Sequence, residues 1–195
     1  TAKRLGAIVT ATDVRPAVKE QVESLGGKFL VVDPEAEKNA ETEGGYAKEM
    51  SVEYKKKQAQ VVQDHIAKQD IVITTALIPG RPAPVLVTED MVKSMQPGAV
   101  IVDLAVEAGG NCPLSELGKV VVKHGVKIIG HDNVPSRLAE ASSALFGRNL
   151  LNFLTPFVDA DKKVLNFDWD DEIVQGTLVS KDGKVVHPRL LPEKK

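Results

Sequence analysis

Short apolar runs rich in valine and isoleucine alternate along the chain with longer segments of helical periodicity. The runs predict strands at residues 7–12, 28–32, 71–75, 99–104 and 127–129. Their apolar residues stand at consecutive rather than alternate positions. That pattern is typical of parallel strands whose two faces are both covered.

Three segments between these runs place apolar residues on one helical face. They predict helices at residues 15–25, 51–68 and 88–95. The last begins with Thr88 as a capping residue and two acids in its first turn, and Pro97 follows its end. Strands and helices that alternate in this way indicate an α/β fold with a doubly wound parallel sheet, of the Rossmann type.

Residues 7–15 have the pattern of the second strand of a dinucleotide-binding βαβ unit. In such units an acidic residue at the end of that strand hydrogen-bonds the adenosine ribose, about 20 residues after a glycine-rich turn. Asp13 has this setting, and Gly6 is expected to end the preceding helix. We therefore expect the first strand and the glycine loop to lie before Thr1. The alternative is that Asp13 only ends a strand and caps the next helix.

Composition is that of an ordinary packed domain, with 43% hydrophobic and 27% charged residues. The 25 basic and 27 acidic residues nearly balance, so charge gives no reason to expect nucleic acid or anionic lipid as a partner. Cys112 is the only cysteine, which excludes an internal disulfide, and we expect it to be a small buried residue. The sequence has no run of about 18 apolar residues, so it predicts no membrane span.

The segment between the second strand and the next helix, residues 33–52, is too long for an ordinary connection. Gly44 and Gly45 can act as a hinge, and Tyr46 and Met50 form a partly apolar tip. Two interpretations stand: a surface insertion, or a mobile loop that closes over a ligand.

Three loops follow strands at the edge where ligands bind in open α/β sheets: residues 74–84, 103–113 and 130–137. In the first, the backbone groups of Ala76 and Leu77 are candidates for contact with a nucleotide.

The second loop carries Asp103 and Glu107 and the glycine pair 109–110. A carboxylate here has two candidate roles, orienting a nicotinamide or acting as an acid or base, although a lone acid in a loop is usually solvated. The glycines allow a ligand to approach the backbone closely.

In the third loop, Asn133 and Ser136 offer an amide and a hydroxyl to a polar ligand. We expect His131 to be a hydrogen-bonded loop residue rather than a catalyst, because nothing near it has metal-ligand spacing.

Residues 70–84, 100–112 and 130–138 together closely resemble the alanine dehydrogenase and nicotinamide nucleotide transhydrogenase superfamily. Residues 44–50 resemble the mobile loop of the NAD(H)-binding domain I (alpha subunit) of proton-translocating transhydrogenase. Alanine dehydrogenases lack that loop. The similarity covers nearly the whole chain and places it in the C-terminal half of domain I.

The resemblance implies a set of cofactor contacts and no metal ligand or catalytic residue. It puts the adenosine ribose on Asp13, with Val14 and Arg15 lining the adenine side. The remaining contacts that it implies are Gly45, Gln58, Leu77 and Tyr46, the last folding down as the loop closes. Glu107 aligns with a catalytic aspartate of alanine dehydrogenases, and this departure favours cofactor binding over deamination.

The resemblance further implies a function and partners. The chain would bind NAD(H) and pass hydride directly to NADP⁺ on a separate NADP(H)-binding domain, with proton movement through a membrane domain. The enzyme would be a homodimer. This chain would belong to its peripheral portion, at the cytoplasmic face of a bacterial inner membrane or the matrix face of a mitochondrial inner membrane. The alternatives are an alanine-dehydrogenase-type oxidoreductase and a non-catalytic NAD-binding module.

Two parts are expected along the chain. Residues 1–134 form an incomplete NAD(H)-binding Rossmann domain. Residues 135–195 contain a long helix at 135–154 that returns to the absent N-terminal half, and a strand pair at 166–187 with a hairpin turn at 181–184. Both are expected to pack on that half of the same domain I.

Overall fold

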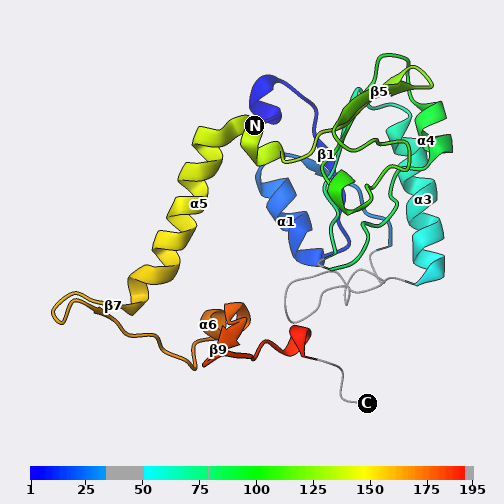
Figure 1. Cartoon of the computed structure of the whole chain (residues 1–195). Coiled ribbons are helices and arrows are strands. Elements are labelled where there is room, and N and C mark those ends of the chain that lie inside the picture. The colour runs from blue at the N-terminus through cyan, green and yellow to red at the C-terminus, as the bar shows by residue number, and fades with distance from the viewer. Residues whose placement is uncertain (34–50, 79, 192–195) are drawn as a thin grey trace. The chain divides into compact units, whose positions relative to one another are not determined.

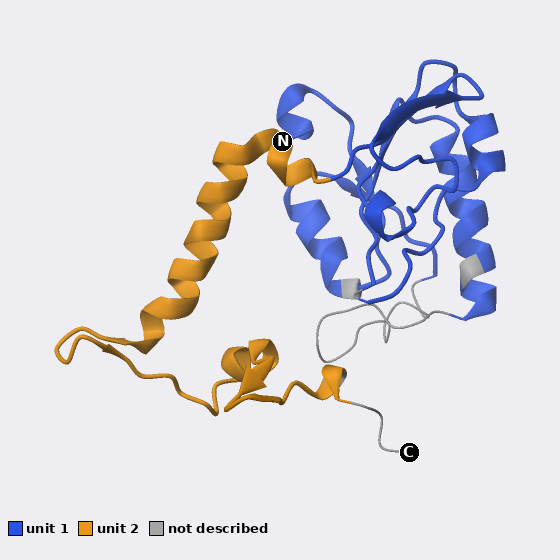
Figure 2. Ribbon diagram, in the orientation of Figure 1, with its two compact units in different colours: residues 1–132 blue, residues 133–195 orange. Residues whose placement is uncertain are grey.

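A computed structural model describes residues 1–33, 51–78 and 80–191 of the chain. It divides into two compact units, residues 1–132 and 133–195, coloured separately in Figure 2. No helix in the described part of the chain is both long enough and apolar enough to cross a membrane.

Unit 1 contains a four-stranded sheet in the order β3-β4-β6-β5 (Figure 1). Its strands are β3 (Ile71–Thr74), β4 (Val100–Asp103), β5 (Lys119–Lys123) and β6 (Val126–Gly130). β3, β4 and β6 are parallel, and β5 runs antiparallel to β6. The predicted α/β fold with a parallel sheet is confirmed.

A separate parallel pair consists of β1 (Thr10–Ala11) and β2 (Lys28–Phe29). Within the described residues β1 does not pair with β3, which is an edge strand of the larger sheet. The side chains of Ile71 and Ile73 on β3 are 64% and 61% exposed. An apolar strand edge of this kind is normally paired or covered.

The helices of unit 1 are α1 (Pro16–Ser24), α3 (Val52–Ile66) and α4 (Glu89–Ser94), with short 3-10 turns at Lys3–Leu5 and Val106–Ala108. The Ser51 hydroxyl accepts the Tyr54 N–H at 3.1 Å, and the Thr88 hydroxyl accepts the Met91 N–H at 3.3 Å. These side chains satisfy N–H groups that have no partner within a helix, which explains where α3 and α4 begin. All three helices lie within two residues of their predicted bounds.

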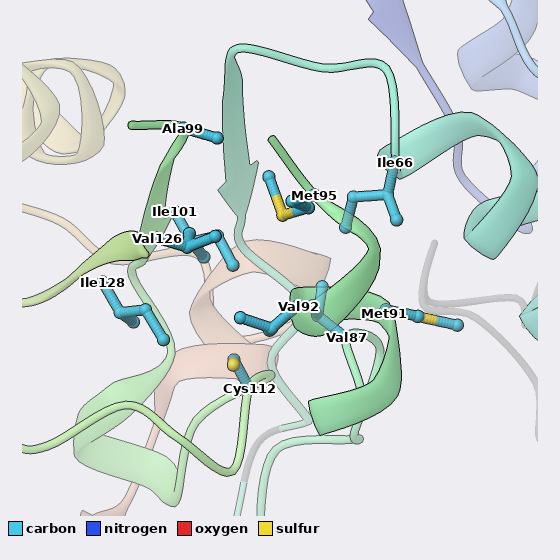
Figure 3. Packing of buried hydrophobic residues seen from close by; sticks show 10 residues of the cluster. All are labelled: Ile66, Val87, Met91, Val92, Met95, Ala99, Ile101, Cys112, Val126 and Ile128. Atoms are coloured by element: carbon cyan, nitrogen blue, oxygen red, sulfur yellow. The ribbon is translucent and has the colours of Figure 1, made fainter. Parts of the chain in front are cut away.

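The hydrophobic core of unit 1 lies between α4, the end of α3 and the four-stranded sheet. Figure 3 shows its ten buried members, which are Ile66, Val87, Met91, Val92, Met95, Ala99, Ile101, Cys112, Val126 and Ile128. Cys112 is buried as expected, and burial raises the pKa of its thiol. The core therefore packs against β4, β6 and Val72 of β3, and it leaves the carboxyl ends of β3 and β4 to the loops.

Unit 2 begins with a 3-10 turn (Val134–Leu138), and the long helix α5 (Ala139–Leu154) starts four residues after its predicted beginning at residue 135 and ends where predicted. The rest consists of short elements: a 3-10 turn (Thr155–Phe157), β7 (Val158–Asp159), β8 (Val164–Leu165), α6 (Glu172–Thr177), β9 (Ser180–Lys181), β10 (Lys184–Val185) and a 3-10 turn (Pro188–Leu190). Phe157 is buried between Phe153 and Phe167, with ring centroids 5.8 and 5.0 Å away. No residue of α5 is buried among those described.

Several predicted bounds and elements need correction. The strands predicted at 7–12 and 28–32 have only two ladder residues each. β5 and the β7–β8 hairpin were not predicted. The strand pair predicted at 166–187 is wrong over most of its range, because α6 lies within it and the strands there are only β9 and β10. The turn at 181–184 is confirmed, since Asp182 and Gly183 both have positive φ between β9 and β10. Gly6 has the expected left-handed conformation, but it ends a 3-10 turn.

Candidate functional site

Asp13 and Arg15 form a closed pair directly after β1. The Asp13 Oδ1 accepts the Arg15 backbone N–H at 2.9 Å and the Arg15 Nε–H at 3.0 Å. Its Oδ2 accepts from a terminal guanidinium nitrogen of Arg15 at 2.8 Å. The pair orients the carboxylate at the beginning of α1, where a parallel α/β unit presents its ligand-binding groups.

Charge favours the ionised form of Asp13. Burial by itself raises the pKa of this carboxyl group, but the hydrogen bonds and the positive charge of Arg15 outweigh it and hold the pKa below its ordinary value. Asp13 is therefore an anionic acceptor at neutral pH, which suits it to bind hydroxyl donors.

Asp103 at the end of β4 is fully buried and accepts hydrogen bonds from the loop that follows it. Its oxygens accept the N–H groups of Ala105, Asn111 and Cys112 at 3.0–3.2 Å. They also accept the hydroxyls of Thr74 and Ser115 at 3.3 and 2.8 Å. With this many donors and no exposed surface, the Asp103 carboxylate holds its loop together and is not solvated. The role in orienting a nicotinamide, or as an acid or base, stays a prediction for the other carboxylate of the loop, Glu107.

The glycine pair also serves this loop. Gly109 and Gly110 have φ of +99° and +83°. A Cβ at Gly110 would lie 2.7 Å from the Asp103 Oδ2. The close approach that Gly110 permits is therefore to Asp103, and the expected approach to a ligand is not needed to explain it.

Asn111 joins the loops that follow β3 and β4. Its Nδ2 donates to the carbonyl oxygens of Ala76 at 2.9 Å and Pro84 at 2.7 Å. Its Oδ1 accepts the Ala76 N–H at 3.0 Å. The Ala76 N–H is thus engaged within the protein, whereas the next residue, Leu77, is 55% exposed.

The remaining candidates lie in different settings. Val14 is half-buried beside Asp13, and Gln58 is half-buried on α3. The neighbour of Gln58, Lys57, forms a 2.9 Å ion pair with Asp33, which follows β2. Gly45 and Tyr46 lie outside the described residues.

The loop after β6 contradicts one expectation, the one for His131, and leaves the ligand contacts of Asn133 and Ser136 as predictions. The Ser136 hydroxyl donates to the Asn133 carbonyl oxygen at 2.8 Å, within its own turn. His131 was expected to be hydrogen-bonded, but its buried Nδ1 has no partner within the described part of the chain. Among the residues that the structure describes, no group of three or more His, Cys, Asp or Glu side chains could hold a metal ion.

Sequence reasoning missed Asn111. An amide directly after two glycines and before an apolar cysteine signals a loop that enters the core, where a polar side chain needs partners. Its partners lie 27 and 35 residues away, and no local pattern identifies them.

Comparison with known proteins gives consistent matches. Residues 1–188 match the family described as Alanine dehydrogenase/PNT, C-terminal domain. An NAD(P) transhydrogenase alpha subunit of Rhodospirillum rubrum is 69% identical over 190 residues, which are 97% of this chain and 50% of that protein. The crystal structure of transhydrogenase from Sinorhizobium meliloti superimposes with a TM-score of 0.74 at 52% identity and covers 95% of this chain and 47% of that one.

The alanine dehydrogenase of Lysinibacillus sphaericus is a more distant match, 29% identical over 76% of this chain and 36% of its own length. The chain spans about half the length of the curated transhydrogenase subunits from Rhodospirillum rubrum and Rickettsia prowazekii that it matches. The resemblance derived from the sequence is confirmed: the chain belongs to the alanine dehydrogenase/PNT C-terminal domain family.

Proposed function

We propose that this chain supplies the adenosine side of the NAD(H) site in a proton-translocating transhydrogenase. The observation that carries the proposal is Asp13, whose carboxylate lies two residues after β1, the first strand of a parallel pair, and is oriented by Arg15. The names of the most similar relatives support the same reaction.

The residues present fit the adenosine end of NAD(H). Asp13 is a half-buried anionic acceptor, and the ribose hydroxyls are donors. Val14 offers an apolar surface beside it, and Leu77 offers another in the exposed loop after β3. Gln58, Gly45 and Tyr46 complete the set that the resemblance implies. Arg15 is the one ambiguous member, because a guanidinium also suits a 2′-phosphate.

Bound NADH supplies the hydride, which passes to NADP⁺ on a separate domain. The part of this chain is to bind and orient the cofactor, so none of its side chains has to donate or accept a proton. Holding two reactants in a fixed arrangement can lower the activation free energy of such a reaction by about 7–11 kcal/mol. The burial of Asp103 within its own hydrogen-bond network agrees with this assignment.

The relatives are two to three times as long as the part that matches this chain, which supports the proposal that further domains act together with it. We propose that these are the N-terminal half of the same domain, an NADP(H)-binding domain and a membrane domain, in a homodimeric enzyme. The corresponding location is peripheral, at the cytoplasmic face of a bacterial inner membrane or the matrix face of a mitochondrial one.

Titration of the complete protein with NADH and NADPH tests the proposal. We expect NADH to bind more tightly, because Asp13 accepts from the ribose hydroxyls and repels a 2′-phosphate. Asp13→Asn should weaken NADH binding by roughly tenfold or more, as expected for a hydrogen bond to a charged group, and should reduce the discrimination.

Asp90→Asn is the matched control, since Asp90 pairs only with Lys93 on the surface of α4 in the described structure and should leave both affinities unchanged. Equal affinity of the unsubstituted protein for the two cofactors would contradict the assignment.

A further inference from the structure

Asn111 is the polar side chain that ties the loop after β3 to the loop after β4. It is fully buried, and its amide is saturated: both Nδ2 hydrogens have carbonyl acceptors and Oδ1 has a donor. Two of these three bonds go to Ala76, one to its N–H and one to its carbonyl oxygen. A side chain that mimics a strand partner in this way fixes both the position and the rotation of that peptide backbone.

Asn111 is itself held on every side. Its N–H donates to the Asp103 Oδ1 at 3.2 Å, and its carbonyl oxygen accepts the N–H groups of Leu86 and Val87 at 2.9 and 3.0 Å. The next side chain, Cys112, is buried in the core with Val87 and Val92 (Figure 3). Asn111 is therefore fixed to the core by its own backbone, and its side chain fixes the Ala76 backbone in turn.

The segment after β3 has little regular structure of its own. Between Thr74 and the helix α4 the described residues form no ladder, and one further backbone bond, from the Ala83 N–H to the Ala108 carbonyl oxygen at 2.8 Å, joins it to the same loop. Leu77 follows Ala76 directly and is largely exposed. Its place at the sheet edge consequently depends on the Ala76 backbone.

We infer that Asn111 is a positioning residue of the nucleotide site, which sets the affinity for NADH by fixing Ala76 and, through it, Leu77. The inference rests on the proposed function. Asn111 does not itself contact the cofactor, because its side chain is fully buried and its hydrogen-bonding groups are all used within the protein.

Asn111→Asp in the full-length protein tests this role. The aspartate keeps the size of the side chain and the acceptor for the Ala76 N–H, but it loses both donors and places a negative charge against two carbonyl oxygens. We expect the Kd for NADH at neutral pH to rise about tenfold or more.

The pH dependence of binding provides the readout that a general loss of stability would not change. A buried carboxyl group beside carbonyl oxygens has a raised pKa, and the neighbouring Asp103 carboxylate raises it further, while the Cys112 thiol stays protonated. Protonation restores one O–H donor. NADH affinity of the variant should therefore recover in part between about pH 8 and pH 5.5, where the unsubstituted protein changes little.

Ser115→Ala is the matched control. Ser115 belongs to the same network, but its hydroxyl donates to Asp103 rather than to the segment after β3. At a comparable loss of melting temperature it should leave the Kd for NADH within about twofold of the original. If Asn111→Asp does not fold, Asn111→Ala replaces it and should give the same loss of affinity without recovery at low pH.

The inference is overturned if the Asn111 variants bind NADH as the original protein does, or if Ser115→Ala weakens binding as much at equal stability. Failure of the unsubstituted protein to bind NADH would instead overturn the proposed function, so the two outcomes are distinguishable.

Discussion

At the scale of single residues, the site depends on how each carboxylate is partnered. Asp13 and Asp103 both end strands of parallel pairs and look alike in the sequence. Asp13 keeps a half-exposed carboxylate with one basic partner, whereas five donors surround Asp103 in the interior. A candidate role for Asp13 could be predicted because it follows from local position. The role of Asp103 could not, because its donors come from residues as far as 29 positions away.

The Asp13–Arg15 pair predicts a measurable change in titration. Arg15→Ala removes the side-chain hydrogen bonds and the positive charge, so the pKa of Asp13 should rise toward or above its ordinary value. Carboxyl ¹³C NMR of Asp13 in the complete protein measures this pKa directly. Arg148→Ala on α5 serves as the control, and an unchanged Asp13 pKa in Arg15→Ala would contradict the pairing.

The same pair has a pH-dependent effect on stability. Because the pKa of Asp13 is lowered in the folded protein, its contribution is present at neutral pH and disappears as the pH falls through that lowered value, below about pH 4. The side chains of Arg15 and Asp13 are 38% and 26% exposed, so the pair contributes only about 0–1 kcal/mol to the free energy of unfolding.

At the scale of elements, periodicity and caps predicted α1, α3, α4 and α5, but they did not predict α6 or the hairpins β5–β6 and β7–β8. β5 and β6 are joined by His124 and Gly125, both with positive φ, which is the geometry of a tight hairpin turn. His-Gly is a weak turn signal beside Asn-Gly, so the valines of β5 were not recognised as a strand. The ladders of β1 and β2 are shorter than their apolar runs because strand ends depend on pairing partners rather than on side-chain pattern.

The helix α5 carries an apolar face that the rest of unit 2 leaves exposed. Phe146, Leu150, Leu151 and Leu154 are between 38% and 65% exposed. A contiguous apolar surface on one helix marks a contact with another part of a protein. We expect the N-terminal half of the same protein to cover it near Leu150.

Leu150→Arg tests this expectation. In the complete protein it should lower the free energy of unfolding by about 2–4 kcal/mol, because it would bury an unpaired charge in an apolar contact. Chemical denaturation measures the change. Asn152→Arg introduces the same residue about 200° away around the helix and should be nearly neutral. Equal effects of the two substitutions would show that the face is not covered.

At the scale of the whole molecule, the parallel pair β1–β2 and the edge strand β3 belong to separate sheets. We expect them to lie on either side of the first strand of one doubly wound sheet. In the strand order of such sheets, the first strand lies between the second and the fourth. The absence of β1–β3 pairing in the described residues agrees with this order. We expect that strand, with its glycine loop, to come from another segment of the same protein and to bring the Asp13 and Leu77 loops together around one cofactor.

We propose that this chain holds NAD(H) for direct hydride transfer to NADP⁺. The complete protein, mixed with the NADP(H)-binding component, is given NADH that carries deuterium at the transferred position of the nicotinamide ring, and the NADPH formed is examined by mass spectrometry. Direct transfer predicts that the deuterium appears in NADPH without exchange with water. NADPH without the label, or no NADPH from a partner shown to be competent with a known transhydrogenase subunit, would contradict the account.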